Sequence, residues 1–499
     1  MMLLGPIQVI VSAIVACVFV CRRVRRTGLS PWWGIAGCGL VALLCATTVI
    51  LWAPPPAAPC TGTMLRGLGL PVSSIWNQIL VPVVIGIAFA INNRRPHMSR
   101  CAGLLSLAFV LLLASHARAQ LAPDGVVADA MKAAGNGKTL QAISLLESHK
   151  DHTYNDILGA LYSFVGNSEK AETLRPHAAR DYETALPTDC RLTEALSEIA
   201  RLAAGRQLVI INEAHDAPEH RAFVGSLVEK LKSIGFSYYA FETLAEGQQS
   251  LKSRGYPVQE TGFYSQEPRF GELIRDAIRC GLIPIRYEAE DNATSGNPLV
   301  DINTREQAQC DNLVEQVFRE TPDARIIIHV GPNHVMEKPR DVGNDKIIWL
   351  AARLKTTTGI DPLTIDQITR LRSFPPEQQL PTVAYSVSGE PFVGGPYEGY
   401  VDLQVYHPPT RMKKNRPDWL LSDQRRRVVN IPDEIKVESK RILLQASYVN
   451  ESSDAIPADQ VLLHPNEPRP VLSLRPGAYR LVRQNEEGDI LPSLKLDVP

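Results

Sequence analysis

The sequence predicts an α/β fold in which helices cover both faces of a parallel sheet. In residues 206–372, short apolar runs alternate with longer runs that have helical periodicity. A helix-length connection between two apolar strands brings the chain back in the same direction, so the strands are expected to be parallel. This domain is expected to follow N-terminal transmembrane or signal helices (1–119) and a short helical region (120–205), and to precede a β-rich C-terminal region (373–499).

Five apolar runs define the expected strands. They are Gln207–Asn212, Ser237–Phe241, Leu282–Tyr287, Arg325–Val330 and Pro362–Ile365. The helix after the first strand is expected to begin with Asp216 as its N-cap, and the next helix covers Phe270–Cys280 and ends at Gly281. A third helix is expected over Thr304–Glu320, since Thr304 and Gln307 have capping-box spacing, and a fourth over Ile347–Lys355.

The first 119 residues differ in charge from the rest of the chain, because they contain nine Arg but no Lys, Asp or Glu. Within 1–97, the runs 2–21, 32–53 and 75–91 are apolar and uncharged. A helix of about 20 residues crosses a hydrocarbon core of about 30 Å. The sequence therefore predicts two to three transmembrane helices in residues 1–97.

A fourth apolar run, Cys101–Ala114, is shorter and resembles a secretory signal peptide. Arg100 precedes it, and Ala117-Arg118-Ala119 follows it as a small-residue cleavage site before Gln120. Residues 98–119 are thus either a signal peptide that starts at Met98 or a fourth span. Either interpretation places residues 120–499 on the extracytoplasmic (periplasmic) side, attached to the membrane or, if cleaved, secreted or periplasmic.

The overall charge is nearly balanced, with 52 Lys and Arg against 53 Asp and Glu. Since nine of the Arg fall in the first 119 residues, the remainder is net acidic, which disfavours nucleic acid as a partner. The expected partners are the membrane and a small-molecule or peptide substrate. Only Cys190, Cys280 and Cys310 follow the apolar segments, and their spacing matches no zinc site.

The regions on either side of the α/β domain have their own patterns. Residues 120–205 read as several short helices, the last over Leu192–Ala204. Residues 373–429 form a Pro- and Gly-rich connection with a strand over Gly399–His407. Residues 430–499 are expected to form a small β-rich module, with a strand over Arg441–Val449 and a turn over Leu474–Tyr479.

Carboxylates and imidazoles follow four successive predicted strands. These residues are Glu213 and His215 after the first strand, Glu242 after the second, Glu288 after the third, and His329 and His334 at and after the fourth. The carboxyl ends of parallel strands meet at one sheet edge, which is where open α/β sheets bind ligands. Arg305, on the following helix, is expected at the same edge, either to neutralise Glu288 or to hold an anion.

Such a cluster allows two kinds of chemistry, and the sequence leaves both open. Without a metal, His215 oriented by a Glu is a general base on water, and Arg305 or His334 stabilises an oxyanion. With a divalent metal, the expected ligands are Glu213, His215 and His334. His220 and His329 are alternative ligands. The signatures of zincins, α/β-hydrolases, P-loop NTPases and dinucleotide-binding proteins are missing.

The segment Ile211–Arg221 (INEAHDAPEHR) resembles the signature of the ChaN-like and erythromycin esterase-like superfamily, to which TIKI/TraB proteins are related. The resemblance also includes Phe241-Glu242, Tyr287-Glu288, the run from Arg305-Glu306 to Asn312 and the Gly331–His334 turn. It covers roughly residues 190–370. Asn212 stands where the pattern usually has Gly.

The resemblance implies an α/β core with its active edge at these residues. Erythromycin esterase-like members hydrolyse a lactone with a His/Glu centre, TIKI-like members resemble metal-dependent peptidases, and ChaN-like members bind haem. The first hypothesis is therefore an extracytoplasmic hydrolase of an ester, lactone or amide, with Glu213, His215, Glu242, Glu288, Arg305 and His334 at its centre. The alternative is a non-catalytic haem- or ligand-binding protein that uses Tyr264 at the same edge.

Overall fold

A computed structural model describes residues 125–149, 152–174, 182–290 and 295–499. Asp129–Pro499 form one compact unit, and the description below concerns that unit. The apolar runs of residues 2–114 and the expected cleavage site before Gln120 lie outside the described residues. Within the described ranges, no helix has the length and apolar character needed to cross a membrane.

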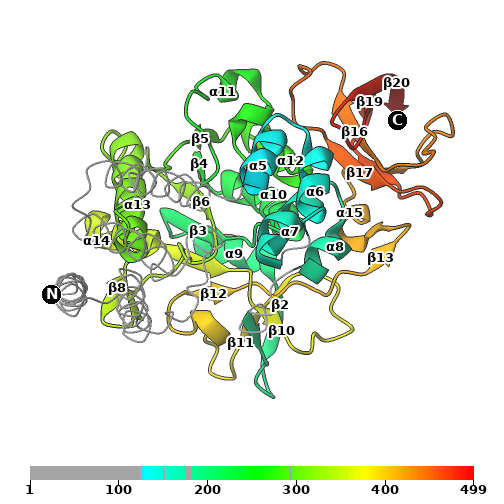
Figure 1. Cartoon of the computed structure of the whole chain (residues 1–499). Coiled ribbons are helices and arrows are strands. Elements are labelled where there is room, and N and C mark those ends of the chain that lie inside the picture. Colours follow the sequence, from blue (N-terminus) through cyan, green and yellow to red (C-terminus); the bar gives the residue numbers. More distant parts are fainter. Residues whose placement is uncertain (1–124, 150–151, 175–181, 291–294) are drawn as a thin grey trace, which may run out of the picture. The chain divides into compact units, whose positions relative to one another are not determined.

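The centre of the unit is a six-stranded sheet in which every neighbouring pair of strands is parallel (Figure 1). Its order is β12 (Leu403–Gln404), β9 (Leu363–Asp366), β3 (Leu208–Asn212), β6 (Ile326–Val330), β4 (Tyr238–Phe241) and β5 (Ile283–Ile285). The five predicted strands are all present. The sixth strand, β12, lies within the strand predicted over Gly399–His407, but it is only two residues long. That strand was expected in a connecting region and not in the central sheet.

Helices cover both faces of the sheet, which confirms the predicted α/β fold. One face is covered by α9 (Ala195–Ala203), α10 (Pro218–Ser233) and α12 (Pro268–Arg279), and the other by α13 (Pro298–Leu313) and α14 (Leu350–Thr358). Every residue of β3 is buried, because Val209 and Ile211 face the first layer and Leu208 and Ile210 face the second. Full burial of one such side chain stabilises the fold by about 1.5–3 kcal/mol.

Several predicted helix starts are wrong. The helices expected from Leu192 and Ile347 begin three residues later, at Ala195 and Leu350, because Leu192–Glu194 and Ile347 belong to short strands. α10 begins at Pro218 with Ala217 as its N-cap, not Asp216, because a residue before proline is held in an extended conformation. α13 begins at Pro298, and the side chain of Asn297 caps it by accepting from the amide of Leu299. The predicted start at Thr304 therefore lies inside the helix, where the Thr304 hydroxyl donates to the carbonyl of Val300.

Residues before the sheet form the expected helical region. It contains α5 (Gly125–Gly135), α6 (Thr139–Glu147), a 3-10 turn (His152–Tyr154), α7 (Asn155–Phe164) and α8 (Ser168–Leu174). Two short strands then precede α9: β1 (Glu183–Thr184) pairs with β10 (Arg370–Leu371), and β2 (Arg191–Glu194) pairs with β11 (Thr382–Tyr385). Segments that come before the central sheet in the sequence therefore pair with segments that come after it.

Further short elements connect these layers. They are α11 (Leu251–Arg254), 3-10 turns at Gln259–Thr261, Tyr264–Gln266 and Gly395–Tyr397, a π-helical turn at Val314–Phe318, the hairpin of β7 (Arg340–Val342) and β8 (Asp345–Ile347), the hairpin of β13 (Met412–Lys413) and β14 (Arg416–Pro417), and α15 (Asp418–Leu421). The turn at Tyr264–Gln266 lies directly before α12 and carries a residue of the site described below.

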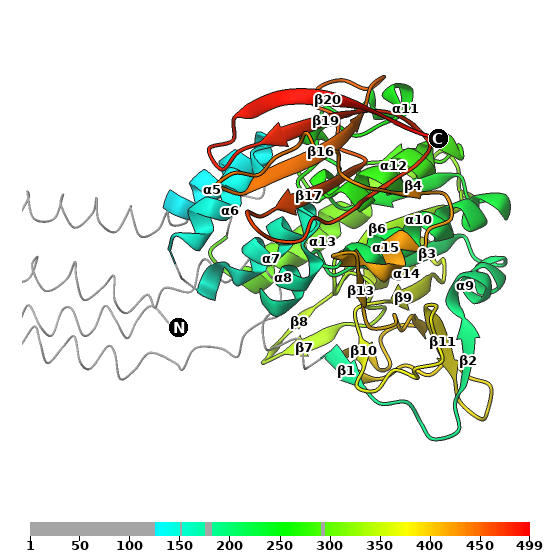
Figure 2. The same cartoon turned by 90° about the vertical axis from the view of Figure 1, so that its right-hand side faces the viewer.

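The C-terminal residues form the expected β-rich module. Its antiparallel sheet has the order β17 (Asp459–Leu463), β16 (Ile442–Tyr448), β19 (Gly477–Gln484) and β20 (Ile490–Val498), and β15 (Arg427–Val429) pairs with β18 (Leu472–Leu474). The predicted turn at Leu474–Tyr479 joins β18 to β19. Figure 2 shows this sheet beside α12, with α5 and α6 at one end of it.

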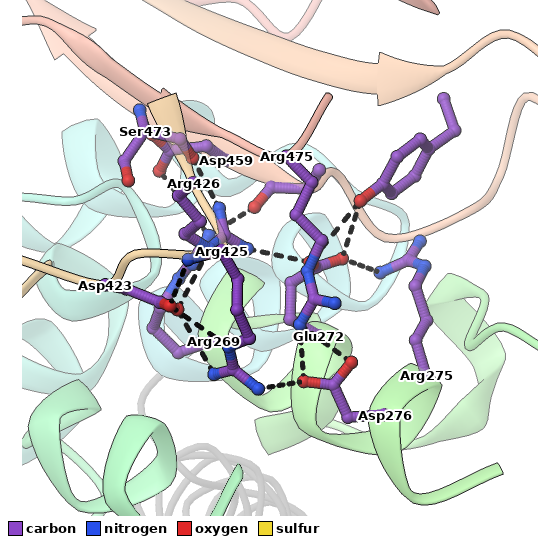
Figure 3. A network of polar contacts seen from close by, with 12 residues as sticks. Arg269, Glu272, Arg275, Asp276, Asp423, Arg425, Arg426, Asp459, Ser473 and Arg475 are labelled. Atoms are coloured by element: carbon purple, nitrogen blue, oxygen red, sulfur yellow. Dashed lines mark hydrogen bonds and ion pairs between the residues drawn. The ribbon is translucent and has the colours of Figure 1, made fainter. Parts of the chain in front are cut away.

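Buried ion pairs join α12 to this C-terminal module (Figure 3). The carboxylate of Glu272 lies 2.7 Å from Arg426 and 3.2 Å from Arg475, and Asp276 lies 2.6 Å from Arg475. Nearer the start of the helix, Arg269 donates to the carbonyl of Ala458. Because these groups are removed from water, each needs its partner, and the contacts fix α12 against the module.

Candidate active site

The candidate site lies at the carboxyl edge of the central sheet. Here the backbone hydrogen bonds to β6 extend one residue beyond the ends of β3 and β4. The amide of Glu213 donates to the carbonyl of Val330 over 2.9 Å, and the amide of Glu242 donates to the carbonyl of His329 over 3.2 Å. The strand ends thereby place two carboxylates on either side of β6, one after β3 and one after β4. Glu288, after β5, joins them through Arg305.

Glu213 is buried among hydrogen-bond donors. Arg221 of α10, itself inaccessible to solvent, donates Nε to Oε2 over 2.8 Å and Nη2 to Oε1 over 2.6 Å. On the far side, Nε2 of His329 lies 3.2 Å from Oε2. Burial raises the pKa of Glu213, but the charge and hydrogen bonds of Arg221, aided by the histidines, outweigh it and hold this pKa well below its usual value. The carboxylate is therefore ionised at neutral pH.

His215 is held by that carboxylate and by an aromatic ring. Its Nδ1 lies 3.1 Å from Oε1 of Glu213, and its ring stacks on Tyr264 with a centroid distance of 3.8 Å and an angle of 12°. These two contacts fix the ring plane. The side chain stays 16% exposed, and its Nε2 makes no hydrogen bond to a described residue.

Gly331 provides the close approach that the site needs. A Cβ at this position would lie 2.8 Å from Oε2 of Glu242 and 3.3 Å from Nε2 of His215. The backbone here is not left-handed, so glycine is required for space and not for conformation. Its amide also donates to Oε2 of Glu242 over 2.6 Å. Nε2 of His215 and the carboxylate of Glu242 therefore lie on the same side of this glycine.

Arg305 bridges two of the predicted carboxylates. Its Nη2 lies 2.6 Å from Glu242 and 2.5 Å from Glu288, and its Nε lies 2.9 Å from Glu288. Nη1 makes no hydrogen bond to a described residue, and the side chain is 28% exposed. The guanidinium is therefore fixed on one side and has donors left for another group.

His334 is a buried cation. Its Nδ1 lies 2.9 Å from Glu306 and its Nε2 lies 3.5 Å from Glu242. Burial lowers the pKa of His334, but the two carboxylates outweigh it and raise this pKa to about 10. His334 is thus unsuited as a base at neutral pH, and suited to stabilise negative charge. In turn, burial raises the pKa of Glu242, but His334 and Arg305 outweigh it and keep this pKa well below its usual value.

The structure brings together all six residues predicted to form the catalytic centre. His329 joins them through Glu213, and Tyr264 through His215. His220 has a different role, because its Nδ1 accepts from the amide of Ala214 over 3.1 Å and its ring lies against His407. It supports the loop that follows β3.

Two members of the site, Arg221 and Glu306, were not predicted. Both lie on the buried stripe of a helix: Arg221 shares a face of α10 with Val224 and Val228, and Glu306 shares a face of α13 with Leu313. Burying a charged side chain within an apolar stripe costs free energy unless an opposite charge pairs with it. A charged residue at an apolar position of the helical pattern was therefore a signal in the sequence that could have identified both residues.

The predicted metal ligands do not fit a metal ion. Both oxygens of Glu213 accept from Arg221, and His334 contacts Glu306 and Glu242 but not Glu213. Arg305 already provides a cation between Glu242 and Glu288. Among the residues that the structure describes, no three or more His, Cys, Asp or Glu are grouped so as to hold a metal.

Haem ligation by Tyr264 does not fit either. Iron is bound by the phenolate form of tyrosine, but burial and the charge of Glu242 raise the pKa of Tyr264 above its usual value. The ring is also stacked against His215. A depression of about 600 Å³ lies elsewhere, on another face of α13, where it is lined by Thr304, Gln307 and Lys346.

Comparison with known proteins yields no family: no family model and no curated protein matches the chain. Among solved structures, RRSP, a MARTX toxin effector domain from Vibrio vulnificus, is 16% identical with a TM-score of 0.28, covering 52% of this chain and 49% of that one. The C-terminal region of Pasteurella multocida toxin, described with a thiol-protease-like catalytic triad, is 11% identical with a TM-score of 0.26, covering 69% and 50%. The chain spans about half the length of these structures, and at such scores the likeness supports no argument.

Proposed function

We propose that the chain is a hydrolase that cleaves an ester, lactone or amide with the Glu/His cluster at the sheet edge. The observation that carries the proposal is the pair of Glu213 and His215. A buried, ionised carboxylate lies against Nδ1, and the opposite nitrogen, beside Gly331, has no hydrogen-bond partner among the described residues. A carboxylate on Nδ1 fixes the tautomer in which Nε2 accepts a proton, which is what a general base requires.

In the proposed reaction, His215 takes a proton from a water molecule as the water oxygen attacks the substrate carbonyl. The negative charge that develops on the carbonyl oxygen is stabilised by the Nη1 donors of Arg305, which no described residue engages. Collapse of the tetrahedral intermediate breaks the bond to the leaving oxygen or nitrogen, which receives the proton from His215. The step thus consumes one water and leaves His215 neutral.

The other charges support this assignment of roles. Glu242 and Glu288 hold the guanidinium of Arg305 in place through three contacts of 2.9 Å or less. Cationic His334 lies behind Glu242 and keeps it ionised. The site therefore pairs one base with a fixed cation, an arrangement suited to stabilise an oxyanion without a metal.

Measurement of hydrolysis tests the proposal. We expect the full chain to turn over at least one member of a panel of esters, lactones and peptides, and His215→Asn to lower kcat/KM about 1000-fold, since positioned general bases contribute roughly 100- to 10,000-fold. His464→Asn is the control, since His464 is a partly exposed histidine of the C-terminal module. Turnover that survives in His215→Asn at the wild-type rate would contradict the proposed role.

We also propose an extracytoplasmic location for the catalytic unit. The support is the carboxylate-free N-terminal sequence and the small-residue site at Ala117-Arg118-Ala119. If the signal-peptide interpretation is right, the mass of the mature protein corresponds to a chain that begins at Gln120. A mature chain that retains residues 98–119 would reject that interpretation in favour of a retained span.

A further inference from the structure

A line of side chains runs from the interior of the sheet to the candidate base. The hydroxyl of Tyr239 on β4 lies 2.9 Å from Nδ1 of His329 on β6. Nε2 of His329 lies 3.2 Å from Oε2 of Glu213, at ion-pair distance but without the alignment of a hydrogen bond, and the other oxygen of Glu213 lies 3.1 Å from Nδ1 of His215. Neighbouring parallel strands in register create this line, since Phe241 and Ile211 both lie opposite His329.

The chemistry of Tyr239 and Glu213 determines which nitrogen of His329, between them, carries a proton. Tyr239 is inaccessible to solvent, and burial together with the charge of Glu213 raises its pKa well above its usual value, so its hydroxyl keeps its proton. At the other end, ionised Glu213 can only accept. A neutral imidazole between a donor and an acceptor accepts at one nitrogen and donates at the other. Nδ1 of His329 thus accepts from Tyr239, and Nε2 carries the proton.

We propose that Tyr239 and His329 are positioning residues for the carboxylate of Glu213: Tyr239 fixes the tautomer of His329, and the Nε2–H of His329 attracts Oε2 of Glu213 across 3.2 Å. This inference rests on the proposed function of Glu213 and His215. Its consequence is that Glu213 presents Oε1 to His215 in one orientation, with Arg221 and His329 fixing the carboxylate from two sides.

The contacts distinguish this role from that of an ordinary buried histidine. His329 is 2% exposed, and the rings of Tyr239 and Phe270 lie near it. An apolar side chain would satisfy those rings equally well. Only a group with both an acceptor and a donor satisfies the Tyr239 hydroxyl and the Glu213 carboxylate together.

Nitrogen NMR of the full chain with ¹⁵N-labelled histidine tests the proton arrangement directly. We expect His329 to be neutral with its proton on Nε2, its signals being assigned by their loss in His329→Gln. A proton on Nδ1, or protonation of both nitrogens at neutral pH, would overturn the proposal. This result is readable without any substrate, so it is independent of whether the chain proves to be a hydrolase.

Matched variants test the consequence for His215. Tyr239→Phe keeps the ring and removes only the hydroxyl, so we expect a shifted ¹⁵N signal of His329 Nδ1 and a loss in kcat/KM of about fivefold, the equivalent of one hydrogen bond. Tyr287→Phe is the control, because its hydroxyl donates to the backbone carbonyl of His329 and not to the ring. Equal effects of the two variants on the signal of His329 and on kcat/KM would contradict the tautomer role.

Substitution of His329 itself provides the last comparison. Gln carries both an acceptor and a donor, so His329→Gln should retain most of kcat/KM, whereas His329→Leu should lose about tenfold or more, because Oε2 of Glu213 is left without this donor. If His329→Gln and His329→Leu lose activity equally while both remain folded, the donor role is rejected.

Discussion

Gly331 shows how a residue without a side chain shapes the site. A Cβ there would lie 2.8 Å from Glu242, which is held in place by Arg305, His334 and the amide of Gly331 itself. The carboxylate cannot move away without breaking these contacts. Arg305, which we propose to bind the substrate carbonyl, contacts the same carboxylate, so the effect of a methyl group should spread to the proposed reaction centre.

We therefore expect Gly331→Ala to lower kcat/KM about tenfold or more, because a displacement of about 1 Å at a reacting centre costs up to roughly 100-fold. Gly205→Ala is the matched control, since a Cβ at Gly205 meets nothing within 4 Å and its backbone is not left-handed. The measurement is steady-state hydrolysis with the unfolding midpoint of both variants. A Gly331→Ala variant that hydrolyses at the wild-type rate would contradict this, because Glu242 would then have freedom to move.

The candidate residues at the strand ends were predictable from the sequence, but their partners were not. Glu213, Glu242 and Glu288 each follow an apolar strand directly, so their shared edge follows from the parallel topology alone. Which carboxylate pairs with which base depends on side-chain positions within helices. The pairing of His334 with Glu306, for example, brings together residues of a loop and of α13 that no local pattern links.

At the scale of elements, α12 joins the candidate site to the C-terminal module. Its N-cap, Glu267, accepts from the amides of Arg269 and Phe270 and lies 3.5 Å from Arg221. Farther along the helix, Glu272 contacts Arg426 and Arg475 of the C-terminal part (Figure 3). One helix thus supports the arginine that holds Glu213 and also anchors the module.

Glu272→Gln should lower the free energy of unfolding by about 3 kcal/mol at pH 7, because breaking a buried ion pair leaves uncompensated arginines. Burial raises the pKa of Glu272, but the arginines outweigh it and lower this pKa to about 2. The stabilisation is then complete above the ordinary value of 4.5 and is lost as the pH falls toward 2. The difference between wild type and variant should shrink over that range.

Chemical unfolding at several pH values measures this difference. Glu487→Gln is the control, since Glu487 pairs with Lys440 at the surface, and we expect its midpoint to match that of wild type. If the Glu272→Gln difference is independent of pH between 4.5 and 2, the charge of Glu272 is not the source of its contribution.

The element boundaries were predicted where a single local signal decides them. Gly281, with φ of 89°, follows the end of α12 as expected. The start of α10 was missed because Pro218 overrides the capping potential of Asp216, and the start of α13 because Asn297 and Pro298 together form an earlier cap. In both cases two signals compete within a few residues, and the one that includes proline prevails.

At the scale of the whole molecule, the α/β architecture was predictable, whereas the docking of the outer regions was not. Continuous apolar strands such as β3 require cover on both faces, which determines the layers. The attachment of the C-terminal module depends on charged contacts between residues far apart in sequence, as with Glu272 and Arg426. Such contacts produce no periodic pattern in the sequence from which they could be predicted. The place of β12 in the sheet was likewise not predictable, because this strand has only two residues.

The proposed chemistry connects all three scales, since the strands place Glu213 and His215, α10 and α12 hold Arg221, and the C-terminal module holds α12. A double-mutant cycle in kcat/KM with Glu213→Gln and His215→Asn tests the central claim most directly. If the two residues act as one unit, each single variant should lose nearly as much as the double variant, because groups that work together are strongly non-additive. Losses that simply multiply, or single variants that hydrolyse at the wild-type rate, would contradict the account.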